Sequence, residues 1–205
     1  MEFSHDAIVV GSGPAGASAT LHLARCGIER VLVIERMSEP AYRRYHSICG
    51  EGVSARSLER AGIEPKEAVR EVDRIEISVP GGPCARIPAD GYIVDRSAMT
   101  ERLLKESGAE IVRATATSAG AVEGGYSIET SAGTFSGPIL IGADGAHSVV
   151  RRCIFGEKPE EFLAIENSIM PGDCGSALRF FVGETEGAYS WEFPSSDGRV
   201  SVGSV

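Results

Sequence analysis

The sequence lacks any apolar run of about 18 residues, the length that a membrane-spanning helix requires, so we expect no transmembrane segment. A regular strand, turn and helix pattern begins at Asp6, almost at the start of the chain, and we therefore expect no signal peptide. Together these absences predict a cytoplasmic protein, for which a peripheral membrane contact stays open.

Disulfide and metal patterns are absent as well. The five cysteines are scattered and none stands in a C-x-x-C pair, which predicts a reducing compartment. The four histidines lack the spacing of metal ligands, so we expect no metal site. No run of basic residues occurs and the formal net charge is −9 at pH 7, which argues against a nucleic-acid partner.

One stretch, Asp6–Arg36, carries a strand, a turn, a helix and a second strand in succession. Residues 7–10 form a short apolar run of the kind found in buried parallel strands. Residues 15–26 are rich in alanine and leucine, which predicts a helix, and residues 31–34 read as the second strand. This succession is typical of an α/β domain with a parallel sheet.

The turn in this stretch reads Gly11-Ser12-Gly13-Pro14-Ala15-Gly16, a G-x-G-x-x-G pattern. Gly11 permits a tight turn, Gly13 lets the backbone approach a pyrophosphate, and Gly16 lets the helix pack closely on the strand. Glu35 ends the second strand, where a carboxylate can hydrogen-bond the ribose of an adenosine. The context predicts a dinucleotide site, and the acid favours FAD or NAD over NADP.

The next region mixes helices with antiparallel strands. Residues 37–40 are predicted to be irregular, and residues 53–61 to form a short helix. Residues 75–79 alternate apolar with polar side chains, which predicts a strand. Its candidate partners are residues 84–88 and 92–94, and we interpret the region as an antiparallel layer inserted between parallel units.

Two glycine loops are candidates for ligand contact. Cys49-Gly50-Glu51-Gly52 is typical of a tight loop near a ligand, and a plain turn before a helix is the alternative. Gly142-Ala143-Asp144-Gly145 follows a short buried strand, at the place where a cofactor loop is expected. Asp144 in that loop either holds hydroxyl groups of a ligand or only caps the following helix.

Aromatic side chains concentrate near the end of the chain, where short strands alternate with glycine turns. Tyr189, Trp191 and Phe193 stand at alternate positions of one predicted strand. Their pattern by itself favours the core of a sheet.

Five ordered motifs resemble known flavoproteins. Gly11–Gly16 with Glu35, the run Tyr92–Arg96, and Gly142–Gly145 with Ser148 and Arg151 are similar to the flavoprotein hydroxylase class, whose type member is para-hydroxybenzoate hydroxylase. Within that class, Cys49–Gly52 and the run Tyr189–Pro194 resemble the geranylgeranyl reductase family more closely than the aromatic hydroxylases. The resemblance extends from Asp6 to the last residue.

This resemblance implies an α/β fold of two domains. A Rossmann-like FAD-binding domain would comprise residues 1–72 and 93–155. An inserted antiparallel β-sheet domain for the substrate would comprise residues 73–92 and 156–205.

FAD is the cofactor that the resemblance implies. The glycine loop would hold its pyrophosphate, Glu35 its adenosine ribose and Asp144 the region of its ribityl chain, and Arg96 would face the cofactor. The implied cofactor contacts are Gly11, Ser12, Gly13, Pro14, Ala15, Gly16, Glu35, Arg36, Cys49, Gly50, Arg96, Ala116, Gly142, Asp144 and Gly145.

The resemblance also implies a reaction, in which reduced flavin saturates carbon–carbon double bonds of an isoprenoid or other apolar small molecule. Tyr189, Trp191 and Phe193 would line the lipid cavity. Cys49, or as a weaker candidate Glu51, would deliver a proton, unless Cys49 only packs as a small apolar group. The electron donor is not identified by the sequence. The alternatives are a flavin monooxygenase that hydroxylates an aromatic substrate, and an inactive or partner-dependent nucleotide-binding fragment.

A complete family member continues past this chain, with a Gly-Asp motif that wraps the flavin and a region that completes the lipid pocket. This chain ends at Gly203-Ser204-Val205, where the family has a Gly-x-Gly. We therefore expect the amino-terminal half of a reductase. It would be a truncated gene product, an expressed piece of a longer protein, or one part of a split protein whose partner is the missing carboxy-terminal half.

Overall fold

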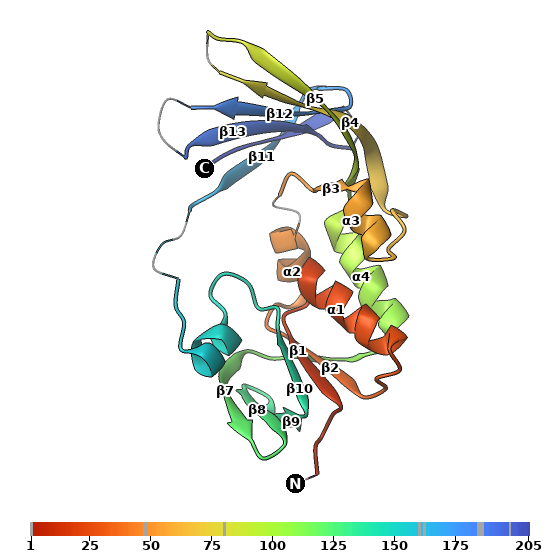
Figure 1. The fold of residues 1–205 in the computed structure, drawn as a ribbon, viewed down its shortest axis with the longest axis vertical. Helices are drawn as coiled ribbons and strands as arrows, with labels where there is room; N and C mark the ends of the chain where they lie inside the picture. The colour runs from red at the N-terminus through yellow and green to blue at the C-terminus, as the bar shows by residue number, and fades with distance from the viewer. Residues whose placement is uncertain are drawn as a thin grey trace. The chain divides into compact units, whose positions relative to one another are not determined.

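The computed structural model describes residues 2–46, 49–79, 81–159, 161, 163–183, 187–196 and 198–205. The chain forms two compact units, each built from two separate stretches of sequence (Figure 1). Unit 1 comprises Met1–Arg43 and Thr100–Glu161, and unit 2 comprises Arg44–Met99 and Phe162–Val205. These boundaries differ from the predicted domain boundaries, because residues 52–54 and 68–72 pair with a strand of unit 2.

Unit 1 is built on a parallel sheet of four strands in the order β10-β1-β2-β6. Every residue of β1 and β2 is buried, which accounts for the apolar runs of residues 7–10 and 31–34. The strands are β1 (Ala7–Val10), β2 (Val31–Glu35), β6 (Glu110–Arg113) and β10 (Ile139–Gly142).

Two elements cover this parallel sheet. Helix α1 (Pro14–Arg25) packs against β1, β2 and β10 (Figure 1). An antiparallel sheet, β7-β8-β9, contacts β1 and β10, and its Ile128 joins Ile8 and Leu32 in one buried core. The strands of this second sheet are β7 (Ala116–Val122), β8 (Gly125–Thr130) and β9 (Gly133–Gly137).

Two helix predictions need correction. The prediction of irregular chain over residues 37–40 is wrong at its end, because helix α2 (Glu39–His46) begins there. Proline is compatible with the first turn of a helix, where its missing N–H costs no hydrogen bond. The helix predicted over residues 53–61 is shorter, because Val53 pairs with Tyr92 in a strand and Ser54 Oγ accepts from Ser57 N as an N-cap.

The other helical elements are α3 (Ala55–Arg60), α4 (Arg96–Ser107) and a π-helix, η1 (Arg151–Phe155). Among the described residues, no helix has both the length and the apolar character that crossing a bilayer requires.

Unit 2 is built on a sheet of seven strands in the order β11-β14-β13-β12-β4-β5-β3. Neighbouring strands are antiparallel except β12 and β4, which pair in parallel. The two predicted partner segments, residues 84–88 and 92–94, belong to one strand, β5. The bounds are β3 (Gly52–Ser54), β4 (Ala68–Ser78), β5 (Cys84–Val94), β11 (Glu166–Pro171), β12 (Ala177–Val182), β13 (Tyr189–Pro194) and β14 (Arg199–Ser204).

One face of the seven-stranded sheet carries a row of alternating charges. Arg86, Glu76, Arg179 and Glu192 stand opposite one another on β5, β4, β12 and β13. Glu76 lies 3.3 Å from Arg86 and 3.2 Å from Arg179, while its side chain is only 11% exposed. The hydrogen bond from Arg74 Nε, at 3.0 Å, lowers the pKa of Glu76 below its ordinary value, against the opposite effect of burial. The arginines therefore hold a nearly buried carboxylate in its charged form.

We expect Glu76→Gln to reduce the acid sensitivity of folding. Because the pKa of Glu76 is lowered in the folded state, its stabilising contribution is present above its ordinary value of 4.5 and is lost as pH falls through the folded-state pKa. Thermal midpoints measured against pH should therefore fall less steeply on the acid side in the variant. Glu129→Gln, at an exposed position of β8, is the matched control. If the thermal midpoints of wild type and E76Q fell equally steeply at acid pH, the lowered pKa of Glu76 would be contradicted.

Candidate functional site

The glycine loop Gly11–Gly16, between β1 and α1, is closed so tightly that Gly11 and Gly16 have no room for a side chain. Gly11 has a φ of +93°, and a Cβ there would lie 2.3 Å from the carbonyl oxygen of Ala143. A Cβ on Gly16 would lie 1.9 Å from the carbonyl oxygen of Gly11. Ala143 belongs to the loop that follows β10. The structure therefore brings together two of the loops that the sequence predicted as cofactor contacts.

No side chain caps the first backbone N–H groups of helix α1. Gly13 is its N-cap and Pro14 stands in its first turn, so no side-chain cap bond is made. The first N–H groups of a helix have no acceptor within it, and the helix dipole adds partial positive charge at that end. The loop is thus chemically suited to a pyrophosphate, whose oxygens would accept from these groups.

Glu35 at the end of β2 is buried, with an exposed fraction of 5%. One carboxylate oxygen accepts from the Ser12 backbone N–H at 3.0 Å and from the Ser12 hydroxyl at 2.7 Å. The other accepts from the Met37 N–H at 2.8 Å. Glu35 therefore holds the glycine loop in place, a role that the sequence did not predict. Its bond to a ribose stays a prediction.

Asp144 uses both carboxylate oxygens within its own turn. Oδ1 accepts from the Ser148 hydroxyl at 2.6 Å, and Oδ2 accepts from the N–H groups of Val149 at 2.6 Å and Val150 at 3.3 Å. Of the two roles considered for Asp144, the structure shows capping of the turn before η1. A contact with a ribityl chain stays a prediction.

In unit 2, the loop Cys49–Gly52 lies directly on the aromatic strand. A Cβ on Gly50 would lie 2.2 Å from Cδ2 of Phe193, so only glycine lets the loop approach the ring so closely. A Cβ on Gly52 would lie 3.6 Å from Cδ1 of Leu178. The two motifs that carry the resemblance to the reductases therefore meet within one unit.

Tyr189, Trp191 and Phe193 alternate along β13 and so share one face of the sheet. The ring centroid of Trp191 lies 6.1 Å from that of Tyr189 and 6.4 Å from that of Phe193. Phe180 stands opposite Trp191 on β12, and its centroid lies 5.1 Å from that of Phe193. The exposed fraction falls from 38% at Tyr189 to 6% at Trp191. The cluster is therefore sheet core at Trp191 and open apolar surface at Tyr189.

Sequence reasoning did not name Phe180 as a site residue. The available signal was the apolar run of residues 180–182, which lies close in sequence to β13 and pairs with it in antiparallel. Gly203 stands opposite Trp191 on β14, and a Cβ there would lie 2.0 Å from Cζ2 of the indole. Gly203 thus provides room for the indole on the neighbouring strand.

Glu51 has a left-handed backbone, with a φ of +57°, which is uncommon for a residue other than glycine. Its carbonyl oxygen accepts from Val94 N at 3.1 Å, and its Oε1 accepts from Arg96 N at 3.3 Å. Burial raises the pKa of Glu51 to about 6, with a smaller contribution from Asp95 in the same direction and an opposing one from the Arg96 N–H. The Glu51 carboxyl therefore gains and loses its proton near pH 6.

The predicted site residues fall into two groups, and their convergence on one cofactor stays a prediction. Ala116, in the first group, packs partly buried against the core of unit 1. Unit 1 holds Gly11, Ser12, Gly13, Pro14, Ala15, Gly16, Glu35, Arg36, Ala116, Gly142, Asp144 and Gly145. Unit 2 holds Cys49, Gly50, Glu51, Arg96, Tyr189, Trp191 and Phe193.

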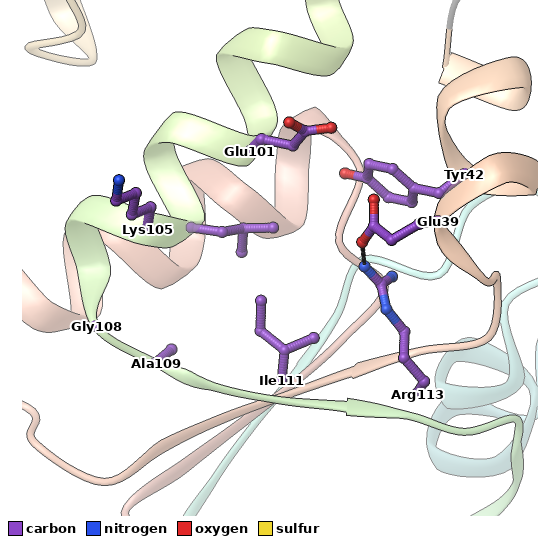
Figure 2. A pocket seen from close by; sticks show the side chains of 9 residues that line it. Glu39, Tyr42, Glu101, Lys105, Gly108, Ala109, Ile111 and Arg113 are labelled. Carbon is purple, nitrogen blue, oxygen red and sulfur yellow. Dashed lines mark hydrogen bonds and ion pairs between the residues drawn. The ribbon is translucent and has the colours of Figure 1, made fainter.

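Unit 1 also contains a pocket of about 280 Å³ that the sequence did not predict (Figure 2). Its polar wall includes the ion pair between Arg113 and Glu39, beside the ring of Tyr42. The lining residues are Glu39, Tyr42, Glu101, Leu104, Lys105, Gly108, Ala109, Ile111 and Arg113.

Comparisons with known sequences support the cofactor prediction. The FAD binding domain family matches residues 4–76, which confirms FAD as the predicted cofactor. The chain is 34% identical, over 99% of its length, to digeranylgeranylglycerophospholipid reductase 2 of Methanopyrus kandleri. It is 31% identical, again over 99% of its length, to reductase 1 of the same organism. It covers 54% and 57% of these two proteins, so the chain spans about half the length of the curated relatives it matches.

Solved structures show the same fold at lower identity. HpxO of Klebsiella pneumoniae, solved with FAD and uric acid, has a TM-score of 0.73 and 21% identity, and the match covers 98% of this chain and 56% of that one. A flavoprotein/dehydrogenase from Cytophaga hutchinsonii has a TM-score of 0.72 and 21% identity, with 97% and 55% covered. These matches confirm the predicted mixed α/β flavoprotein fold.

We expect Gly50→Ala to disturb the aromatic face. The added methyl group would overlap the ring of Phe193, and overpacking of this kind costs about 1–3 kcal/mol. Trp191 is the sole tryptophan of the chain, so its fluorescence reports on the neighbouring Phe193 ring. The emission spectrum should change and the urea midpoint should fall. In Gly120→Ala, where a Cβ meets open space, both should stay as in wild type. A G50A protein with unchanged emission and midpoint would disprove the close packing.

Proposed function

We propose that this chain, a relative of the digeranylgeranylglycerophospholipid reductases that carries an FAD-binding domain, belongs to an FAD-dependent enzyme that reduces carbon–carbon double bonds of an isoprenoid chain. The kinship rests on the 34% identity over nearly the whole chain, which confirms the resemblance predicted from the motifs. The observation that carries the proposal is the packing of the Cys49–Gly52 loop on Phe193, because it joins a polar loop to an apolar face.

The cofactor is assigned to residues of both units. In unit 1, the glycine loop offers backbone N–H groups to the pyrophosphate, Glu35 offers acceptor oxygens to the adenosine ribose, and Arg36, Ala116 and the Gly142–Gly145 loop complete the set. In unit 2, the proposed contacts are Cys49, Gly50 and Arg96. When bound, FAD in its reduced form supplies the hydride for the reduction.

The substrate is assigned to the aromatic face. The curated relatives are named as reductases of a digeranylgeranylglycerophospholipid, and a geranylgeranyl chain is long and apolar. Tyr189, Phe193 and Phe180, packed around the buried Trp191, offer apolar surface of matching character. This face excludes water from the bound chain and orients it by van der Waals contact.

Saturation of an alkene also requires a proton at the second carbon atom. Cys49 and Glu51 are the candidates in the loop that touches the aromatic face. Glu51 has the more suitable acidity, because burial raises its pKa to about 6 and a half-buried carboxylic acid near neutral pH is an effective donor. We therefore rank Glu51 above Cys49, which reverses the order predicted from the sequence.

The proton-donor role predicts a pH dependence. Below about pH 6 the Glu51 carboxyl is protonated, so the rate of a single turnover with pre-reduced flavin should fall about tenfold per pH unit above that value. Glu51→Gln should lower the rate at pH 6 and flatten this profile, with flavin binding intact. Cys49→Ala should retain the wild-type profile. A slow C49A and a wild-type-like E51Q would assign the proton to Cys49 instead.

FAD titration of the 205-residue chain tests the proposed function. Bound FAD should give a flavin spectrum and raise stability by about 2.7 kcal/mol at one hundred times the dissociation constant. Chemically reduced flavin on the protein should then be reoxidised without oxygen by a geranylgeranylated lipid.

Two other outcomes would overturn the reductase assignment. NAD(P)H consumption stimulated by a small aromatic compound, with peroxide or a hydroxylated product, would identify a monooxygenase. Binding of ADP without FAD would identify a nucleotide-binding fragment that is inactive or depends on a partner.

A further inference from the structure

Tyr42, on α2, forms a hydrogen bond to the backbone of the glycine loop Gly11–Gly16. Its side chain is among the largest that are fully buried, with an exposed fraction of 1%. The hydroxyl donates to the carbonyl oxygen of Ser12 at 2.6 Å and lies 3.1 Å from Thr100 Oγ1. A tyrosine hydroxyl has one proton and a carbonyl oxygen only accepts, so the shorter contact to Ser12 takes that proton.

Ser12 is fixed on both sides as a result. Its N–H donates to Glu35 at 3.0 Å, and its carbonyl accepts from Tyr42. Ser12 is itself buried, with an exposed fraction of 1%, so water does not compete for either group. The two peptide groups that flank Ser12 therefore each have one anchored end.

The anchored carbonyl determines the direction of the next N–H. Among the described residues no peptide bond is cis, and in a trans peptide the carbonyl and the following N–H point in opposite directions. The bond from Tyr42 to the Ser12 carbonyl thus fixes the orientation of the Gly13 N–H. Gly13 is the N-cap of α1, at the end of the helix where phosphate oxygens are expected to bind.

Other contacts hold Tyr42 in turn. The guanidinium carbon of Arg113 lies 5.3 Å from the centre of the Tyr42 ring. Arg113 also donates to the Met37 carbonyl at 3.1 Å, while the Met37 N–H donates to Glu35. Ser12, Glu35, Met37, Arg113 and Tyr42 therefore form a closed ring of contacts. The pocket in Figure 2 lies beside this ring, with Tyr42 and Arg113 in its wall.

We propose that Tyr42 is a positioning residue for the pyrophosphate of the cofactor. It orients the Gly13 N–H through the Ser12 carbonyl and touches no ligand atom itself. This inference rests on the proposed FAD site and adds to it a side chain from α2. Its function is to keep the loop in its binding conformation before the cofactor arrives, which lowers the entropy lost on binding.

The test compares ligands with and without phosphates on Tyr42→Phe, which removes one hydroxyl and leaves the ring. ADP and FAD should bind about five- to tenfold more weakly, since one neutral hydrogen bond contributes a factor of that size. Adenosine has no phosphate, so its affinity, measured by NMR titration, should equal that for wild type. The decisive quantity is therefore the ratio of ADP to adenosine affinity, which a general loss of stability would not change.

Two control variants accompany Tyr42→Phe. Tyr45→Phe alters a tyrosine of the same helix that is 55% exposed, and it should bind ADP as wild type does. Thr100→Val removes the other hydroxyl beside Tyr42 and should retain the wild-type ratio. An unchanged ratio in Y42F, or an equal change in T100V, overturns the positioning role. Wild-type protein that binds neither ADP nor FAD overturns the proposed cofactor site, and the positioning role with it.

Discussion

Close backbone approach at glycine is the constraint on which both groups of predicted site residues depend. At Gly11 the backbone lies against Ala143, and at Gly50 it lies against the ring of Phe193, each at a distance that no Cβ could share. The first approach closes the loop at the start of α1. The second brings a polar loop onto an apolar face. In both cases the absence of a side chain is what permits the neighbouring element to reach its position.

Each unit contributes a different kind of chemistry. Unit 1 offers hydrogen-bond groups whose directions are set by buried partners, as with Ser12 between Glu35 and Tyr42. Unit 2 offers a sheet with one aromatic face and one face crossed by charges, on which Glu76 is compensated by three arginines. The charged row adds ion pairs between neighbouring strands, on the face opposite the aromatic side chains.

Local patterns predicted the elements that depend on local physics. The succession of β1, α1 and β2 was predicted from apolar runs that glycines separate. The strands were recognisable because burial on both faces of a parallel strand leaves little room for polar residues. Helix α2 was missed in part, because Pro40 reads as a breaker although the first turn of a helix tolerates it. The parallel pairing of β12 with β4 joins residues about a hundred positions apart, and a local sequence pattern does not predict pairing over that separation.

The sequence by itself determined the glycine turn of a dinucleotide site through the spacing of its residues, and it implied the family and the cofactor FAD through the resemblance of its motifs to known flavoproteins. Only the tertiary structure decided which residues hold the loop and which motifs meet. Tyr42 reached Ser12, and Gly50 reached Phe193, through contacts between segments far apart in the chain. Such contacts depend on how whole elements pack, and packing is set by shape and burial summed over many residues rather than by any local pattern.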